Sequence, residues 1–273
     1  MEIILTGTGT PIPDPNRAGP STLVKAGDTQ ILVDAGRGVV MRLAGAATGP
    51  PALDAVLITH LHSDHVCALN DVITTHWVMS QEQATLRIFG PVGTEEFVRR
   101  QMHALEPDIA YRTEHHNFLE HGPQLVVTDL EPGDTFSIND VMVSTAATEH
   151  SPVKPTIGFR LEHDGSIAAL VGDTLPCDGV DELARDADAY VQTALRRDIL
   201  EPIPVQGVQD ILEYHSGVVD AAHTATRVGA RRLVFTHMVP APQPVDYPDW
   251  IAHAAAHFDG EVIIGDDLTS VTI

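Results

Sequence analysis

The sequence predicts an α/β fold in one domain that spans residues 1–273. Short apolar runs rich in β-branched residues alternate along the chain with longer segments of helical periodicity, which is the pattern of α/β proteins. A length of 273 residues lies at the upper end for one domain, and 43% hydrophobic residues suffice for a sizeable core. No segment has the composition of a linker, so a division into two domains is not expected.

The expected strands are apolar runs that end in loops rich in Gly, Pro or polar residues. In chain order they cover Glu2–Leu5, Thr29–Val33, Ala55–Ile58, Leu125–Val127, Val141–Ser144, Ala168–Val171, Leu233–Phe235 and Glu261–Ile264. Helical patterns cover Asp64–Met79, Thr94–His103, Val218–Val228 and Asp249–His257. Ser216 is a suitable N-cap for the third helix, because a serine hydroxyl can accept a hydrogen bond from the first turn.

Charge and cysteine usage restrict the class of protein. The net charge is −22, from 16 Lys and Arg against 38 Asp and Glu. Because phosphate contacts dominate nucleic-acid binding, such an acidic chain disfavours a nucleic-acid partner. No apolar run is long enough for a membrane span and no leader precedes the first strand, so we expect a cytoplasmic protein without membrane contact. Of the two cysteines, Cys67 is expected to be a buried structural thiol.

A cluster of potential metal ligands follows the third expected strand. Residues 59–65 are Thr-His-Leu-His-Ser-Asp-His, and the ligand side chains among them are His60, His62, Asp64 and His65. Imidazole and carboxylate groups suit Zn²⁺, Mn²⁺ or Fe²⁺. Alternate residues of a tight loop can face one point, and these donors together with others are too many for one tetrahedral ion. The cluster therefore predicts two divalent metal ions, with zinc favoured.

The segment His60-Leu61-His62-Ser63-Asp64-His65 resembles the metal-binding motif of the metallo-β-lactamase superfamily. Further segments resemble its ribonuclease Z branch, in the same order along the chain: Met1–Gly9, Ile31–Gly36, Gly90–Thr94, Gly172–Thr174 and Leu233–His237. The resemblance covers essentially the whole chain. It implies a four-layer αββα sandwich whose halves meet near residue 130, with loops of both halves along one rim. It also implies a homodimer.

The resemblance extends the ligand set to residues that each follow a downstream strand. His150 corresponds to the third ligand of a first metal, beside His60 and His62. Asp173 corresponds to the carboxylate that bridges both ions. His237 corresponds to a ligand of the second metal, beside Asp64 and His65. With this second set complete, a mononuclear iron site is not expected.

Two further residues are expected to take part in catalysis. Asp64 would orient a metal-bridging hydroxide or accept its proton, besides holding the second metal. His215, in Tyr214-His215-Ser216, resembles the His of a branch motif that lies near the scissile group. It is therefore a candidate general acid or oxyanion contact, although a histidine that merely precedes a helix is the alternative. Asp34 is either a support for a metal ligand or a residue of a strand-end turn.

The chain departs from ribonuclease Z in two places. Val191–Arg196 stands where that branch carries a His-Glu-Ala-Thr motif, and the segment between His150 and Asp173 is too short for a tRNA-binding arm. We therefore expect a hydrolase that acts on a small ester through a metal-bridging hydroxide, with a phosphodiester or aryl sulfate favoured. The alternatives are a tRNA 3′ endonuclease of the ribonuclease Z type, a carboxylic ester or lactone hydrolase, and a non-hydrolytic dioxygenase or inactive metal-binding scaffold. Residues 105–121 form either a cap over the metals or an ordinary surface loop.

Overall fold

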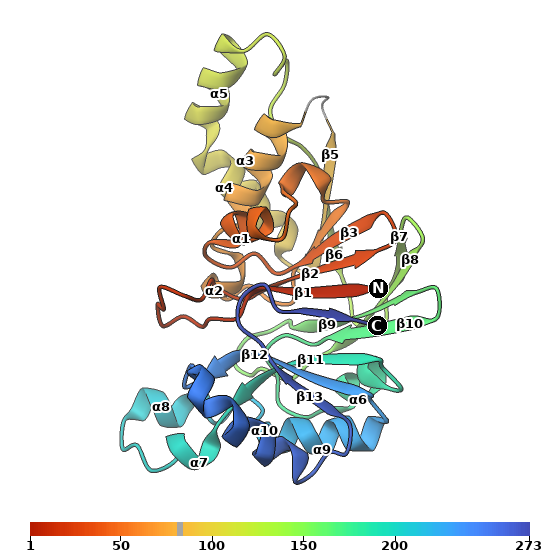
Figure 1. The fold of residues 1–273 in the computed structure, drawn as a ribbon. Coiled ribbons are helices and arrows are strands. Elements are labelled where there is room, and N and C mark those ends of the chain that lie inside the picture. Colours follow the sequence, from red (N-terminus) through yellow and green to blue (C-terminus); the bar gives the residue numbers. More distant parts are fainter. Residues whose placement is uncertain (81–83) are drawn as a thin grey trace.

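A computed structural model describes residues 1–80 and 84–273. Two mixed sheets, each of seven strands among the described residues, stack face to face, and helices cover the outer side of each sheet (Figure 1). The order in the first sheet is β14-β1-β2-β3-β4-β5-β6, and in the second it is β13-β12-β11-β10-β9-β8-β7. The chain crosses from one sheet to the other between residues 130 and 135. The expected four-layer α/β sandwich is confirmed.

The strands and helices have the following bounds. The first sheet contains β1 (Glu2–Gly7), β2 (Ser21–Ala26), β3 (Thr29–Val33), β4 (Ala55–Leu57), β5 (Thr85–Pro91), β6 (Gln124–Leu130) and β14 (Ser270–Thr272). The second contains β7 (Thr135–Ile138), β8 (Val141–Ala147), β9 (Ile157–His163), β10 (Ser166–Leu170), β11 (Ala189–Leu195), β12 (Arg232–Val239) and β13 (Glu261–Ile264). The helices are α1 (Val39–Gly45), α2 (Ser63–Val66), α3 (Leu69–Met79), α4 (Thr94–Ala104), α5 (Glu106–His115), α6 (Asp178–Ala184), α7 (Arg197–Leu200), α8 (Gln206–Ile211), α9 (Val218–Val228) and α10 (Tyr247–Ala255).

Three apolar layers hold the sandwich together. The layer between the sheets includes Ile31 from the first sheet and Phe159 from the second, both without exposed surface. A second layer, with Leu43 of α1 and Ile73 of α3, covers the outer face of the first sheet. A third layer, with Trp250 of α10, covers the outer face of the second sheet. Because central strands such as β1 and β4 are buried on both faces, they are continuous apolar runs rather than alternating ones.

Tertiary hydrogen bonds interrupt the helix that was expected over Asp64–Met79. The backbone N–H of Ala35 donates to the carbonyl of His65 at 2.7 Å, and the N–H of Ala68 donates to the carbonyl of Ala35 at 3.0 Å. These bonds use groups that a continuous helix would need, so α2 ends at Val66 and α3 begins at Leu69. Cys67 lies exposed at this junction, so the prediction of a buried thiol was wrong.

The start of α9 also differs from the prediction. The helix begins after Gly217, whose N–H donates to the carboxylate of Asp220 at 2.8 Å. The hydroxyl of Ser216 donates instead to the carbonyl of Thr174 at 2.7 Å, so Ser216 ties two loops together and is not the N-cap. Among the described residues, no helix is both long and apolar enough to cross a membrane.

The strand directions place the loops that carry the predicted ligands on one rim. In the second sheet β8 and β10 are each antiparallel to β9, and β10, β11 and β12 are mutually parallel, so β8, β10 and β12 end on the same side. In the first sheet β3 and β4 run parallel and also share an end. Strands that run in the same direction bring the residues after them together, as in other α/β sites.

Candidate metal centre

All seven predicted ligands lie in two adjacent groups on this rim. His60, His62, His150 and Asp173 form the first group, and Asp64, His65 and His237 form the second. Within each group, one donor atom from every residue lies within 4.8 Å of the others. All are buried except His62, which is half-buried. The loop after β4 supplies His60 and His62, the following helix α2 supplies Asp64 and His65, and loops or strand ends of the second sheet supply the rest.

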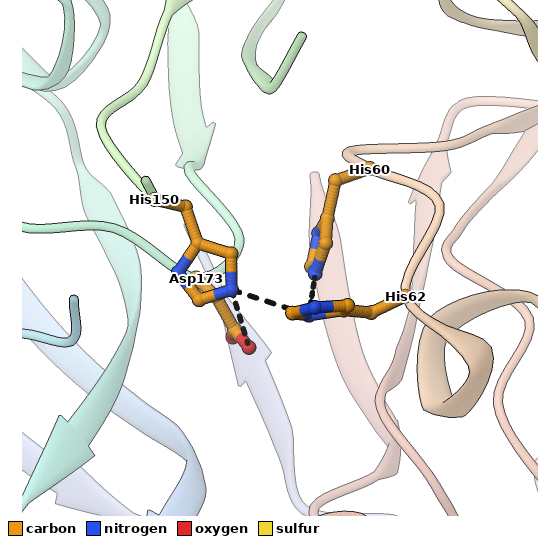
Figure 2. Close-up of side chains that lie close together, drawn as sticks. All are labelled: His60, His62, His150 and Asp173. Atoms are coloured by element: carbon orange, nitrogen blue, oxygen red, sulfur yellow. Dashed lines mark hydrogen bonds and ion pairs between the residues drawn. The ribbon is translucent and has the colours of Figure 1, made fainter. Parts of the chain in front are cut away.

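The first group has the spacing that one tetrahedral ion requires (Figure 2). His62 Nδ1 lies 3.2 Å from His60 Nε2 and 3.2 Å from His150 Nε2. Two nitrogens bound to one tetrahedral zinc at about 2.0–2.1 Å would lie about 3.3 Å apart. The three imidazoles therefore converge on one point, and His62 offers Nδ1 whereas the other two offer Nε2. Asp173 Oδ2 lies 4.0 Å from His150 Nε2 and completes the group.

The second group converges on the same carboxylate oxygen. Asp64 Oδ2 lies 3.2 Å from His237 Nε2. Asp173 Oδ2 lies 3.3 Å from His65 Nε2 and 3.5 Å from His237 Nε2. One oxygen of Asp173 therefore stands between the two groups, which is the position of a bridging ligand.

Thr193 fixes the orientation of Asp173. Its hydroxyl lies 2.7 Å from Asp173 Oδ1 and donates to it, which leaves Oδ2 to face the histidines. Gly172 precedes Asp173 with a φ of 64°, and a Cβ there would lie 2.8 Å from the hydroxyl oxygen of Thr59. Only glycine fits this left-handed position and this close approach. Sequence analysis did not identify Thr193, which lies in the segment where the ribonuclease Z motif is missing.

A bulge in β12 turns His237 toward the centre. Thr193 of β11 pairs with Thr236, but Leu195 pairs with Val239, so β12 contains one extra residue at this point. His237 has a φ of 46°, which is uncommon for a residue other than glycine. Bulges redirect side chains at strand ends and next to active sites. A regular strand would not point this ring at Asp173.

Asp34 supports one histidine in each group. Its Oδ2 accepts a hydrogen bond from His65 Nδ1 at 2.8 Å and another from the hydroxyl of Thr59 at 2.8 Å. Because the Thr59 proton is used in this way, the Thr59 oxygen accepts from His60 Nδ1 at 3.0 Å. Both rings are thus protonated at Nδ1 and keep Nε2 for a metal. The structure favours the supporting role for Asp34 over that of a simple turn residue.

The pKa directions suit a cation between these groups. Burial lowers the pKa of His60 well below its usual value, and burial lowers the pKa of His150 to about 4, so both rings are neutral near pH 7. Burial alone would raise the pKa of Asp173, but the nearby positive charges of His237 and His65 outweigh it and lower the pKa well below its usual range. Burial would lower the pKa of His65, but Asp173 and Asp34 outweigh it and raise the pKa well above its usual value.

A buried nitrogen of His65 marks the second group as a place for a further positive charge. Among the described residues, the buried side-chain atoms without a hydrogen-bond partner are His65 Nε2, His237 Nδ1 and Gln101 Oε1, and of these His65 Nε2 faces the carboxylates of the group. Buried polar atoms without a partner are rare, and a bound ion is one explanation for them. His65 Nε2 is the atom expected to bind a metal, and a divalent ion would replace the proton that it otherwise carries between carboxylates. The donor set therefore fits two divalent ions.

His215 lies beside the carboxylate of Asp173. Its Nδ1 donates to the carbonyl of Ile211 at 3.0 Å, and its Nε2 lies 3.2 Å from Asp173 Oδ2. Arg197 holds the loop that carries this histidine by donating to the carbonyls of Leu212 and His215, at 2.7 and 3.0 Å. His215 Nε2 therefore faces the oxygen of Asp173 that lies between the two groups.

Two cavities open at the centre. One, of about 200 Å³, is lined by residues of both groups together with His215 and Tyr214. The other, of about 400 Å³, is lined by His62, Tyr214, Asp210 and Glu213, among other residues. None of residues 105–121 lines either cavity. Figure 1 shows α5 at the far end of the N-terminal half, and the indole N–H of Trp77 donates to the carbonyl of His121 at 2.9 Å. This segment is not a cap over the centre.

Comparison with known proteins identifies related chains over the full length. The family model described as "Beta-lactamase superfamily domain" matches residues 29–238. A protein named Ribonuclease Z from Mycobacterium bovis (strain BCG / Pasteur 1173P2) is 49% identical over 275 residues, which cover 100% of this chain and 98% of that one. A protein of the same name from Mycolicibacterium gilvum (strain PYR-GCK) is 47% identical over 100% of this chain and 96% of its own.

Solved structures share the fold at lower identity. The metallo-beta-lactamase fold protein YhfI from Bacillus subtilis superposes with a TM-score of 0.76 at 19% identity, covering 99% of both chains. The short form of human tRNase Z superposes with a TM-score of 0.73 at 23% identity, covering 100% of this chain and 99% of the other. Both are similar in fold to this chain.

Proposed function

Because the chain belongs to the metallo-β-lactamase superfamily, in its ribonuclease Z-like branch, we propose that it hydrolyses phosphodiester bonds of RNA with two divalent metal ions. The observation that carries this proposal is the full-length similarity, at 49% identity, to relatives named Ribonuclease Z. The donor groups around Asp173 support it, because they have the spacing of a dinuclear centre. These relatives favour the tRNA 3′ endonuclease over the small ester that was expected from the two departures from the ribonuclease Z pattern and from the net charge. They also conflict with the expectation that RNA is not a partner.

The residues of the centre have distinct tasks in this proposal. Divalent ions bound here would polarise the ester and activate a water molecule for attack. Asp64 would hold the second ion and would orient that water or accept its proton. His215 would donate a proton from Nε2 to the departing oxygen. The many imidazole donors suit zinc, with manganese or iron as alternatives. The homodimer and the cytoplasmic location stay predictions.

A second candidate is the hydrolysis of a small phosphodiester. Asp210 and Glu213, both exposed, line the larger cavity beside His62. Together with the net charge of −22, these carboxylates would repel a long polyanion at this entrance. In addition, the segment 151–172 is too short for a tRNA-binding arm. This surface favours a substrate with one or few phosphates.

Cleavage assays separate the two candidates. The protein loaded with zinc or manganese is incubated with a tRNA precursor that carries a 3′ trailer, and separately with bis-p-nitrophenyl phosphate, an aryl sulfate, an aryl ester and a lactone. We expect release of the trailer. An intact precursor together with rapid turnover of the bis-aryl phosphate would favour the second candidate. If protein with two bound metals cleaves neither phosphodiester, both candidates are wrong.

Replacing His215 with Ala tests the general acid. We expect unchanged metal content, a small effect on esters of nitrophenol, and a decrease of about a hundredfold for esters with poor leaving groups, since only these need a proton as the bond breaks. The rates are compared along a series of leaving groups of rising pKa. Equal loss on all of them would show that His215 does not act as the acid.

A further inference from the structure

The smaller cavity beside the centre has an apolar wall. The cavity has a volume of about 200 Å³. In addition to the residues of the centre, it is lined by Thr10, Pro11, Ile12, Leu195, Ile211, Tyr214 and Val239, most of which are apolar. Among the described residues that line it there is no lysine or arginine. A site for further phosphates of a nucleic-acid backbone would need cationic or N–H donors. The wall therefore suits an uncharged group of the substrate.

Two different parts of the chain build this wall. Leu195, Ile211 and Val239 pack with a small cluster beneath them that contains the buried Leu200 and Leu212. This cluster belongs to α7, α8 and the ends of β11 and β12, so the floor of the cavity is held by packing. The opposite side comes from the proline-rich loop after β1, and Figure 1 shows that loop on the same side of the molecule as α7 and α8.

Ile12 stands out on that loop. Its side chain is 70% exposed, although it borders a cavity that reaches the metal-ligand residues. A single exposed isoleucine is ordinary, but Ile12 lines the same cavity as the apolar side chains of Ile211 and Val239. A ligand in that space would remove both surfaces from water.

Tyr214 separates this cavity from the acidic one. Its ring lies edge-on to His150, with ring centroids 5.0 Å apart at 80°, and 4.6 Å from the ring of His215. It lines both cavities, as does His62. An aromatic group in the apolar cavity would contact the ring of Tyr214 while its ester linkage lies beside Asp64 and Asp173.

We propose that this cavity is a subsite for one planar aromatic ring of the substrate, attached close to the scissile phosphoester. A cavity of about 150 Å³ lined by apolar side chains is enough to bind benzene, so the present one accommodates an aryl ring or a nucleobase. The proposal rests on the phosphodiester hydrolysis proposed above, because the metal centre is what holds the phosphoryl end. Outside the centre, Thr10 and Tyr214 are the described lining residues whose side chains can form hydrogen bonds, and the rest of the wall is apolar, so recognition is mainly by shape and apolar contact.

Binding of matched anions tests the subsite without turnover. Calorimetry on the zinc-loaded protein compares phenylphosphonate with methylphosphonate, which share the anionic group and differ in the ring. A second pair, uridine 5′-phosphate and ribose 5-phosphate, differs in the nucleobase. We expect the ring-bearing member of at least one pair to bind about tenfold more tightly, given the apolar area it buries.

Two variants test whether the apolar side chains of the wall cause this preference for a ring. Ile12→Ser should reduce the ratio of affinities severalfold, and Ile211→Thr should do the same, with circular dichroism confirming that each variant is folded. Ile251→Ser is the matched control, because it changes an isoleucine that is 37% exposed on α10, outside both cavities. Its ratio should equal that of the unmodified protein.

Each outcome bears on the proposal. A preference in the phenyl pair identifies an aryl ester, a preference in the nucleotide pair identifies a nucleobase, and either supports the subsite. Equal affinities within both pairs, or a preference that survives in Ile12→Ser and Ile211→Thr, would overturn it. If the affinities are equal while phosphodiesters are still cleaved, the subsite alone is wrong. If no anion binds and no phosphodiester is cleaved, the proposed function fails as well.

Discussion

Replacing Asp173 with Ala is expected to release bound metal and to lower turnover about a thousandfold or more, while the fold stays largely intact. Oδ2 of Asp173 lies within 4.0 Å of His150, His65 and His237, so it is the donor that joins the two groups. Without this carboxylate, the repulsion between the two dications would be less well compensated by negative charge. Removing a residue that holds the reacting centre usually has effects of this size. The fold survives because Asp173 lies on the rim, outside the three apolar layers.

Metal analysis and activity measurements check this prediction together. Elemental analysis of the purified variant gives the metal content per chain, and circular dichroism with thermal unfolding reports on the fold. Asp178→Ala is the matched control, since it removes an exposed carboxylate at the start of α6, the helix that follows the loop of Asp173. We expect this control to keep its metal and its turnover. Two ions per chain and normal turnover in the Asp173→Ala variant would mean that Asp173 is not a ligand.

Replacing Asp34 with Asn is expected to weaken zinc binding by about 10–100-fold, the usual effect of losing a residue that orients ligands. One carboxylate accepts hydrogen bonds from the Thr59 backbone N–H, the Thr59 hydroxyl and His65 Nδ1. An amide has one oxygen, so its NH₂ group would face at least one of these donors. The mismatch in a buried position should also cost about 1–3 kcal/mol of stability. Because His60 is hydrogen-bonded to Thr59, the substitution should disturb the orientation of His60 as well as that of His65.

Zinc titration against a chelator of known affinity measures this effect. Turnover of the Asp34→Asn variant should be low at limiting zinc and should recover in excess zinc, whereas the Asp173→Ala variant should not recover. The control is Asp259→Asn, which changes an exposed residue between α10 and β13. Zinc affinity equal to that of the control in a folded variant would argue that Asp34 has no supporting role.

Much of the fold could be predicted from local patterns. The strands that carry the centre, such as β4 and β12, are apolar runs, and their approximate positions were predicted correctly. Strands such as β9 and β11 were missed, because they contain polar residues whose partners lie elsewhere in the fold. Gln192 and Thr193 in β11 are examples: both are buried, and the hydroxyl of Thr193 meets Asp173. Their polarity gave no strand signal in the sequence.

The candidate ligands were recognisable for two reasons: His60, His62, Asp64 and His65 form a cluster after an apolar run, and His150, Asp173 and His237 stand near strand ends in segments that resemble motifs of the superfamily. A residue close to the end of a strand lies on the rim of the sheet, whatever position that strand has in the sheet. The supporting residues were harder to find. Thr59 and Thr193 are ordinary threonines whose roles depend on hydrogen bonds to Asp34 and Asp173, which are distant from them in sequence. Likewise, the sequence gives no sign that Pro11 and Ile12 line one cavity together with Ile211 of α8.

By itself, the sequence determined the α/β alternation and the chemical identity of the donors, since both depend on local residue type and spacing. Only the tertiary structure decided that α2 stops at Val66, that a bulge aims His237 at Asp173, and that Asp34 connects both histidine groups. These features come from hydrogen bonds between segments far apart in the chain. Such bonds have no local pattern, because the partner that satisfies each group is chosen by the packing of the two sheets.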